Sequence, residues 1–183
     1  ACSAGQIRKK GPVPITWRPE VSNRFRTEIE QLPATAASAI ELDIAELESF
    51  AHEATADCLT VVGSGGSLTA AHFARLLHEH LGRPARAMTP MEYMTSPPIL
   101  SDESVLILSA GGTNKDALGA FAAAARAEPH QLLALTTRAD TPLKDLASEY
   151  HWARHVNCGI GRSKDGFLAT NSILMMIIAV WRA

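Results

Sequence analysis

Two short apolar stretches constrain the fold more than any other feature of this sequence. Residues 58–62 run directly into the small-residue segment 63–67, and residues 104–108 run into the similar segment 109–114. Short runs of apolar, β-branched residues are typical of strands that are buried on both faces of a sheet. Because a helical pattern follows each run, we expect an α/β fold in which helices cover both faces of a parallel sheet.

The same alternation continues along the chain. We expect further strands at residues 85–88, 132–135 and 152–156, and helices at residues 68–81, 115–127, 143–147 and 167–181, with a loop at residues 159–166. Five strands in an open, doubly wound sheet is the natural count. Ligands of such sheets bind outside the carboxyl ends of the strands.

Two helices are expected ahead of the sheet. The first covers residues 21–31 and ends before Pro33, because the residue before a proline disfavours helical geometry. The second covers residues 34–56, and it carries an apolar face at spacings of three and four. That face consists of Ile40, Ile44, Leu47 and Phe50. Residues 1–19 are rich in glycine and proline, so we expect an irregular lead-in there and a single domain over residues 20–183.

Length and composition exclude several classes of protein. The 183 residues suit one domain, and the net charge of −2 gives no reason to expect a nucleic-acid partner. The apolar run at residues 173–181 is too short to span a membrane, and no apolar stretch follows the basic residues 8–10, so no signal peptide is expected. Cys2, Cys58 and Cys158 have neither metal-ligand nor disulfide spacing. We expect a reduced, cytoplasmic protein without membrane contact, cofactor or metal.

The first glycine-rich segment has the composition of an anion-binding loop. Ser64, Gly65, Gly66 and Ser67 are small, so backbone amides can approach a ligand closely, and the following helix adds partial positive charge. Ser67 can also cap that helix. The alternative is a tight turn without a ligand, although the glycines exceed what a turn needs. A dinucleotide site is excluded because Leu68 replaces the third glycine, and a Walker loop is excluded because no lysine follows.

The second segment repeats this chemistry at the end of another strand. Its serine, threonine and asparagine side chains offer hydrogen bonds, and its glycines free the backbone. The residues concerned are Ser109, Gly111, Gly112, Thr113 and Asn114. Thr136 and Thr137 follow a third strand and add hydroxyls to the same edge of the sheet. Helix capping or solvation is the alternative for each single hydroxyl, but the three loops together favour a phosphorylated small molecule.

These segments resemble the sugar isomerase (SIS) domain family. Residues 61–67, followed by 71–74, look like the first phosphosugar loop of phosphoheptose isomerases, and residues 108–116 are similar to the second loop of the family. Residues 135–137 match the end of the third strand. Residues 165–172 resemble the segment that opens the last helix in the isomerase half of glucosamine-6-phosphate synthase. The resemblance covers roughly residues 20–183.

The resemblance implies a five-stranded, flavodoxin-like fold that binds a sugar phosphate. By position, Ser67, Ser109 and the backbone at Gly111 and Gly112 would hold the phosphate. Asn114 replaces a threonine of the family, and Gly111 stands where the family often has a second serine.

Aldose–ketose isomerisation requires a base that moves a proton between two carbons. Asp165 lies near the position of a family glutamate, and His155 stands near the carboxyl end of a strand, so both are candidate catalytic residues. Asp165 could equally cap a helix. Lys164 could meet an anionic ligand, with solvated surface charge as the alternative. His72 matches a family metal ligand, but Leu76 occupies the place of the accompanying carboxylate, so no metal is expected.

Two functions therefore stay open. One is a sugar-phosphate isomerase, and the other is a non-catalytic phosphosugar-sensing or dimerisation module of a larger or tandem protein. We also expect a homodimer, or pairing with a second SIS domain, because helices such as 34–56 commonly meet a partner in this family. His78 and His80 lie toward the far end of their helix and are expected to face solvent.

Overall fold

The computed structural model describes residues 19–54, 58–95, 103–159 and 169–183, with side chains from residue 25 onward. The irregular lead-in expected at residues 1–19 lies outside these residues except for its last position. Most of the expected loop at residues 159–166, including Lys164 and Asp165, also lies outside them.

The five expected strands form one parallel sheet in the order β2-β1-β3-β4-β5. The strands are β1 (Cys58–Gly63), β2 (Ala85–Met88), β3 (Glu103–Leu108), β4 (Gln131–Thr136) and β5 (Arg154–Asn157). β1 and β3 are neighbours, and their register pairs Gly63 with Leu108. The two small-residue loops therefore leave the same edge of the sheet side by side.

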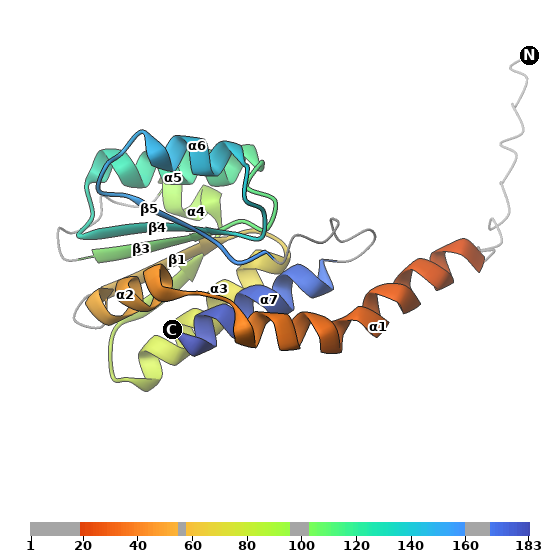
Figure 1. Ribbon diagram of the computed structural model, residues 1–183. Coiled ribbons are helices and arrows are strands. Elements are labelled where there is room, and N and C mark those ends of the chain that lie inside the picture. Colours follow the sequence, from red (N-terminus) through yellow and green to blue (C-terminus); the bar gives the residue numbers. More distant parts are fainter. Residues whose placement is uncertain (1–18, 55–57, 96–102, 160–168) are drawn as a thin grey trace, which may run out of the picture.

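Helices cover both faces of the sheet, as expected from its apolar strands (Figure 1). One face carries α4 (Pro90–Thr95), α5 (Lys115–Ala127) and α6 (Pro142–Ser148), and the other carries α2 (Ala45–Ala54), α3 (Gly66–His80) and α7 (Thr170–Arg182). α1 (Pro19–Glu41) packs along α7 and projects beyond the rest of the fold. No helix in the described ranges combines the length and apolarity needed to cross a membrane.

Alternate strand residues supply two separate cores. Val61, Leu106 and Leu133 pack beneath α2, α3 and α7, whereas Val62 and Val105 belong to the core beneath α4, α5 and α6. This division follows from the strand geometry, because successive side chains point to opposite faces. All six residues of β3 are buried, which places this strand at the centre of the fold.

The boundary between the two N-terminal helices differs from the expectation. α1 continues through Pro33 to Glu41, and α2 begins only at Ala45. Pro33 removes a single helical hydrogen bond, while Asn171 of α7 bonds to Glu28 before it and to Thr35 after it. The break falls at residues 42–44, where an Asp43 carboxylate oxygen accepts a hydrogen bond from the Ala45 amide at 3.1 Å.

Two surface expectations also prove wrong. The expected apolar face is not continuous. Ile44 and the buried residues of α2 belong to the core, but Ile40 lies on α1, before the helix break, and is 57% exposed. His78 is buried, because it continues the buried stripe that Ser67, Ala71 and Ala74 form along α3 at helical spacing. His80 is exposed as expected.

Candidate functional site

The first candidate loop joins β1 to α3. Gly65 is the N-cap residue of α3 and has a φ of +54°, in the left-handed region that favours glycine. α3 begins at Gly66, so Ser67 lies inside the first turn. Contrary to the expectation, Ser67 therefore does not cap the helix. The Ser67 amide donates to the Ser64 carbonyl oxygen at 3.1 Å. No side chain caps α3, and the Leu68 amide donates to the Gly65 carbonyl oxygen at 3.1 Å, so backbone carbonyls of the loop pair two amides of the first turn.

The second candidate loop joins β3 to α5 and is fixed by backbone hydrogen bonds. The Ser109 amide donates to the Leu135 carbonyl oxygen at 3.0 Å, and the Gly112 amide donates to the Ser109 carbonyl oxygen at 3.1 Å. Gly112 has a φ of +60°. Asn114 is the N-cap of α5, where its side-chain oxygen accepts from the Asp116 amide at 2.8 Å. The loop is therefore held in shape before any ligand arrives.

One side chain connects the two loops. The Nδ2 group of Asn114 donates to Ser64 Oγ at 3.3 Å. Because the oxygen of the same amide is held by the start of α5, its nitrogen has to point toward the first loop. Asn114 therefore sets the position of one loop relative to the other.

A hollow of about 200 Å³ lies between these loops. Its wall combines loop residues from the ends of β1 and β3 with residues from the start of α7. The lining residues are Ser64, Gly66, Ser67, Ser109, Ala110, Gly111, Thr113, Asn114, Ala169, Ile173 and Met176. Most of the binding residues expected from the sequence are thus brought together, and Gly65 and Gly112 lie in the same two loops.

Two serine hydroxyls in this wall are buried and have little bonding of their own. Ser67 and Ser109 are each 7% exposed. The hydroxyl of Ser67 has only the Met176 sulfur at 4.0 Å, a weak acceptor at the limit of hydrogen-bond distance. Within the described ranges the Ser109 hydroxyl has no hydrogen bond. Buried polar groups are ordinarily paired, so both hydroxyls are suited to a ligand.

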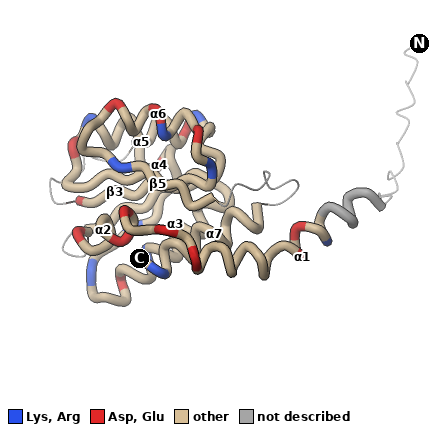
Figure 2. Tube along the Cα trace, in the orientation of Figure 1, with Lys and Arg blue, Asp and Glu red and all other residues tan. Residues whose placement is uncertain are grey.

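The electrostatic character of the wall comes from helix ends. α3, α5 and α7 each contribute residues from their first turn or N-cap, where the helix dipole favours negative charge. The first turns of α3 and α7 contain no acidic residue, whereas α5 has Asp116. In Figure 2, α7 is uncharged until its C-terminal end. None of the described lining residues is titratable, so the wall suits an anion but supplies no acid or base.

The two threonines at the end of β4 point to different places. Thr137 lies at the rim, where its amide and its hydroxyl donate to the Ala110 carbonyl oxygen at 3.0 and 2.9 Å. Thr136 is fully buried, and its hydroxyl donates to the Arg138 carbonyl oxygen at 2.7 Å. Neither lines the hollow: Thr137 supports the second loop from behind, and Thr136 belongs to a neighbouring network.

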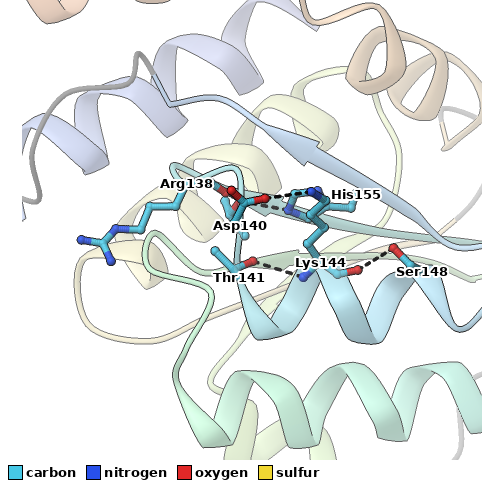
Figure 3. A network of polar contacts seen from close by, with 7 residues as sticks. Arg138, Asp140, Thr141, Lys144, Ser148 and His155 are labelled. Atoms are coloured by element: carbon cyan, nitrogen blue, oxygen red, sulfur yellow. Dashed lines mark hydrogen bonds and ion pairs between the residues drawn. The ribbon is translucent and has the colours of Figure 1, made fainter.

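That network contains His155 (Figure 3). Its Nε2 lies 3.0 Å from the Thr136 hydroxyl, and Lys144 lies nearby in an ion pair with Asp140 at 3.1 Å. Burial, reinforced by the Lys144 charge, lowers the pKa of His155. His155 does not line the hollow, so the structure does not bring this expected catalytic residue to the other expected residues.

The remaining candidates are not brought into a common site. Lys164 and Asp165 lie outside the described residues. His72 is exposed on α3 and does not line the hollow. Across the described ranges, no three His, Cys, Asp or Glu side chains come close enough to hold a metal ion.

Sequence reasoning missed the apolar part of the wall. Ile173 and Met176 are three residues apart on α7, Ala169 is the N-cap residue before it, and Ala110 lies inside the second loop. The spacing predicts that the α7 residues share a face. It does not say which face meets the loops, because the rotation of α7 depends on its packing against α3.

Comparison with known proteins gives matches of structure only. No protein-family profile and no curated sequence matches this chain significantly. A candidate sugar-phosphate isomerase of Listeria monocytogenes is 19% identical with a TM-score of 0.65, over 91% of this chain and 88% of the other. Tagatose-6-phosphate ketose/aldose isomerase of Escherichia coli is 19% identical with a TM-score of 0.67, over 88% of this chain and 47% of the other.

A protein solved together with a sugar phosphate has the same fold. NanR of Vibrio vulnificus, solved in complex with ManNAc-6P, is 16% identical with a TM-score of 0.61, over 89% of this chain and 60% of the other. This chain therefore spans about half the length of two of the three structures. At these identities the matches establish the fold, and they confirm the resemblance that the loops indicated: this chain has the fold shared by phosphosugar isomerases and phosphosugar-binding domains.

Proposed function

We propose that this chain binds a sugar phosphate in the hollow between its two small-residue loops. The observation that carries the proposal is the pair of buried, weakly bonded hydroxyls of Ser67 and Ser109 at the carboxyl ends of adjacent strands. The phosphate would bind these hydroxyls together with backbone amides of the two loops. Among proteins of this fold, NanR was solved with ManNAc-6P, and another is a tagatose-6-phosphate isomerase.

Helix ends supply the attraction for the phosphate in this proposal. The first turn of α3 is uncapped and has no acidic side chain, and α7 likewise starts without one. Amides at helix N-termini bind anions through hydrogen bonds and the helix dipole together. Asn114 adds a neutral donor, because its amide nitrogen faces the first loop.

A matched pair of variants at Asn114 tests the binding site. Asn114→Asp and Asn114→Ser both keep a good N-cap for α5, but only Asn114→Asp adds a negative charge beside Ser64. With fructose 6-phosphate at about 100 times Kd, the unsubstituted protein should gain roughly 5–10 °C in Tm. We expect Asn114→Asp to lose most of that gain and Asn114→Ser to keep a substantial part of it.

The same experiment can refute the proposal. Without ligand, both variants should melt within a few degrees of the unsubstituted protein, which shows that the fold is intact. If Asn114→Asp is stabilised by the sugar phosphate as strongly as the unsubstituted protein, the phosphate does not bind at these loops. If neither fructose 6-phosphate nor N-acetylmannosamine 6-phosphate stabilises any of the three proteins, the proposed function is wrong.

Isomerase activity is the second candidate function. The described wall contains no titratable side chain, so the base would come from elsewhere. Asp165 is only four residues before Ala169, which lines the hollow, and it is the candidate base in this chain. Incubation with fructose 6-phosphate in D₂O should then place deuterium on the carbon next to the carbonyl, and Asp165→Asn should abolish this exchange. Binding without exchange would favour a sensing module.

We further propose that the site is completed by pairing, either in a homodimer or with a second domain of the same fold. Phe25, Ile29 and Ile40 are between 42% and 57% exposed on α1, which projects beyond the fold. Apolar residues of this size on one projecting helix are typical of an interface. Light scattering at micromolar concentration should give the mass of two chains, and the mass of one chain would contradict the homodimer.

A further inference from the structure

Two exposed cations stand where the loops around the hollow meet solvent. Lys115 directly follows Asn114, which lines the hollow. Arg138 directly follows Thr137, whose hydroxyl donates to the carbonyl oxygen of the lining residue Ala110 at 2.9 Å. Within the described ranges, neither cationic side chain forms an ion pair or a hydrogen bond.

The burial of the lining residues indicates where the hollow opens. Ser67 and Ser109 are buried, whereas Thr113 and Asn114 are exposed. A phosphate bound to the two serines would therefore lie at the closed end, and the rest of the ligand would extend toward Thr113 and Asn114. The next residue along the chain is Lys115, so its charge lies at the open end.

Lys115 occupies the first position of α5, where a positive charge is unfavourable. Amides at a helix N-terminus carry partial positive charge, so cations are favoured at the opposite end. Asp116 does not neutralise it, because consecutive residues of a helix do not face each other. Side chains also lean toward the helix N-terminus, which directs Lys115 toward the loop. Since no described residue offsets this cost by pairing with Lys115, the position is typical of a residue that serves binding.

Arg138 is fixed at the rim by its backbone. Its carbonyl oxygen accepts from the Thr136 hydroxyl at 2.7 Å, and the residue before it is bonded to the second loop. Figure 3 shows the Arg138 side chain pointing away from His155 and Lys144. The guanidinium group therefore lies outside the network around His155 and can meet a ligand.

We propose that the ligand carries a second negative group, which Lys115 and Arg138 bind at the opening of the hollow. This inference rests on the proposed function, because it assumes that the phosphate lies between Ser67 and Ser109. The ligand class is a sugar phosphate with a carboxylate or a second phosphate at its far end. Guanidinium and ammonium groups bind either anion, so the two cations define the charge of this group and leave its identity to the experiment.

Two matched pairs of probes test the proposal by isothermal titration calorimetry. Glucitol 6-phosphate and 6-phosphogluconate differ only at the first carbon, where one has a hydroxymethyl group and the other a carboxylate. Fructose 6-phosphate and fructose 1,6-bisphosphate give the same comparison for a second phosphate. In about 50 mM salt we expect the more charged member of at least one pair to bind about fivefold to tenfold more tightly. In about 1 M salt most of this gain should disappear, because exposed charges are screened.

Charge-removing variants locate the binding group. Lys115→Gln and Arg138→Gln should each reduce the gain about twofold to threefold, and the double variant should abolish it. Arg126→Gln is the control, because Arg126 is exposed in the last turn of the same helix as Lys115 and its loss changes the net charge equally. The control should keep the full gain. All three positions are exposed, so the variants should melt within a few degrees of the unsubstituted protein.

The outcomes separate the two proposals. Equal affinities within both probe pairs, or a gain that survives in the double variant, would overturn the second anion site and leave phosphate binding intact. An equal loss in Arg126→Gln would also overturn it, since net charge rather than the rim would then set the preference. Failure of all four sugar phosphates to bind would overturn the proposed function and this inference with it.

Discussion

Single residues decide the shape of the second loop, and Gly112 is the most constrained of them. Its φ is +60°, and a Cβ atom there would lie 2.6 Å from Thr141. The Gly112 carbonyl oxygen also accepts from the Leu143 amide at 3.1 Å, so the loop is attached to the start of α6. A side chain at this position would meet both backbone strain and a steric clash.

Three glycine substitutions separate these two costs. Gly111→Ala should change the free energy of unfolding by less than about 1 kcal/mol, because the nearest atom to its Cβ is 3.5 Å away. Gly82→Ala has open space but a φ of +75°, so strain should cost about 1 kcal/mol. Gly112→Ala should cost about 2–4 kcal/mol. Urea denaturation measures all three, and equal losses for Gly111→Ala and Gly112→Ala would contradict this account.

Glu103 predicts a pH dependence of stability. It is buried, and its carboxylate accepts hydrogen bonds from Thr60 and from Arg86 at 2.6 Å. Burial raises the pKa of Glu103 above its ordinary value, although Arg86 opposes the shift. The folded protein therefore holds this proton to higher pH than the unfolded chain. Stability from this group is greatest below the ordinary carboxyl pKa and falls as pH rises through the raised value.

Glu103→Gln removes this titration while it keeps an oxygen acceptor. Its Tm relative to that of the unsubstituted protein should therefore increase as pH rises from 4.5 to 8. Glu103→Ala serves as the comparison, since it leaves Thr60 and Arg86 without their acceptor and should be less stable throughout. A Tm difference between Glu103→Gln and the unsubstituted protein that is independent of pH would show that Glu103 does not titrate in this range.

At the scale of the elements, α7 organises more of the molecule than its sequence indicates. It lies beside α1, α2 and α3, and its N-terminal half lines the hollow. Both of its ends contact α1 or the residue that follows it: Thr35 donates to the Asn171 side-chain oxygen at 2.6 Å, and Arg182 donates to the carbonyl oxygen of Leu42, directly after α1, at 2.7 Å. Asn171 also donates to the Glu28 carbonyl oxygen at 3.1 Å, so α7 holds α1 on both sides of Pro33, and this explains how α1 passes through the proline without a break.

Removal of the Arg182 contact should loosen α1 in particular. Arg182 also donates to the Ala39 carbonyl oxygen at 2.9 Å, so it pairs two carbonyls where α1 ends. Arg182→Ala should cost about 1–3 kcal/mol of stability, and Arg182→Lys should recover part of it. Circular dichroism during urea unfolding provides the measurement. The interpretation fails if Arg182→Ala is as stable as the unsubstituted protein.

The elements also show what the sequence could predict. All five strands and the two loops were predictable, because buried strands and small residues are local features, as in residues 104–108 and 109–114. The helix boundary at residues 42–44 was not, because packing against α7 overrides the local effect of Pro33. The apolar wall was not predictable either, since it depends on how α7 is rotated. Thr136 and Thr137 look alike in sequence, yet only Thr137 reaches the rim.

At the scale of the whole molecule, burial increases toward the middle of the sheet. Every residue of β3 is buried, whereas all four residues of β2 are only partly buried. Backbone amides in β3 should therefore exchange with D₂O far more slowly than those in β2, which open in local fluctuations. Hydrogen exchange followed by mass spectrometry measures this difference. Similar protection of β2 and β3 would indicate that an additional element covers the β2 edge.

The hollow lies where the two helical layers meet, and this position has a mechanical consequence. Ser67 and Ile173 belong to the layer beneath the sheet, while Thr113 and Asn114 lead into α5 in the layer above it. A molecule that binds residues of both layers acts as a clamp between two otherwise separate cores. Ligand occupancy would therefore link the core beneath α2, α3 and α7 to the core beneath α4, α5 and α6.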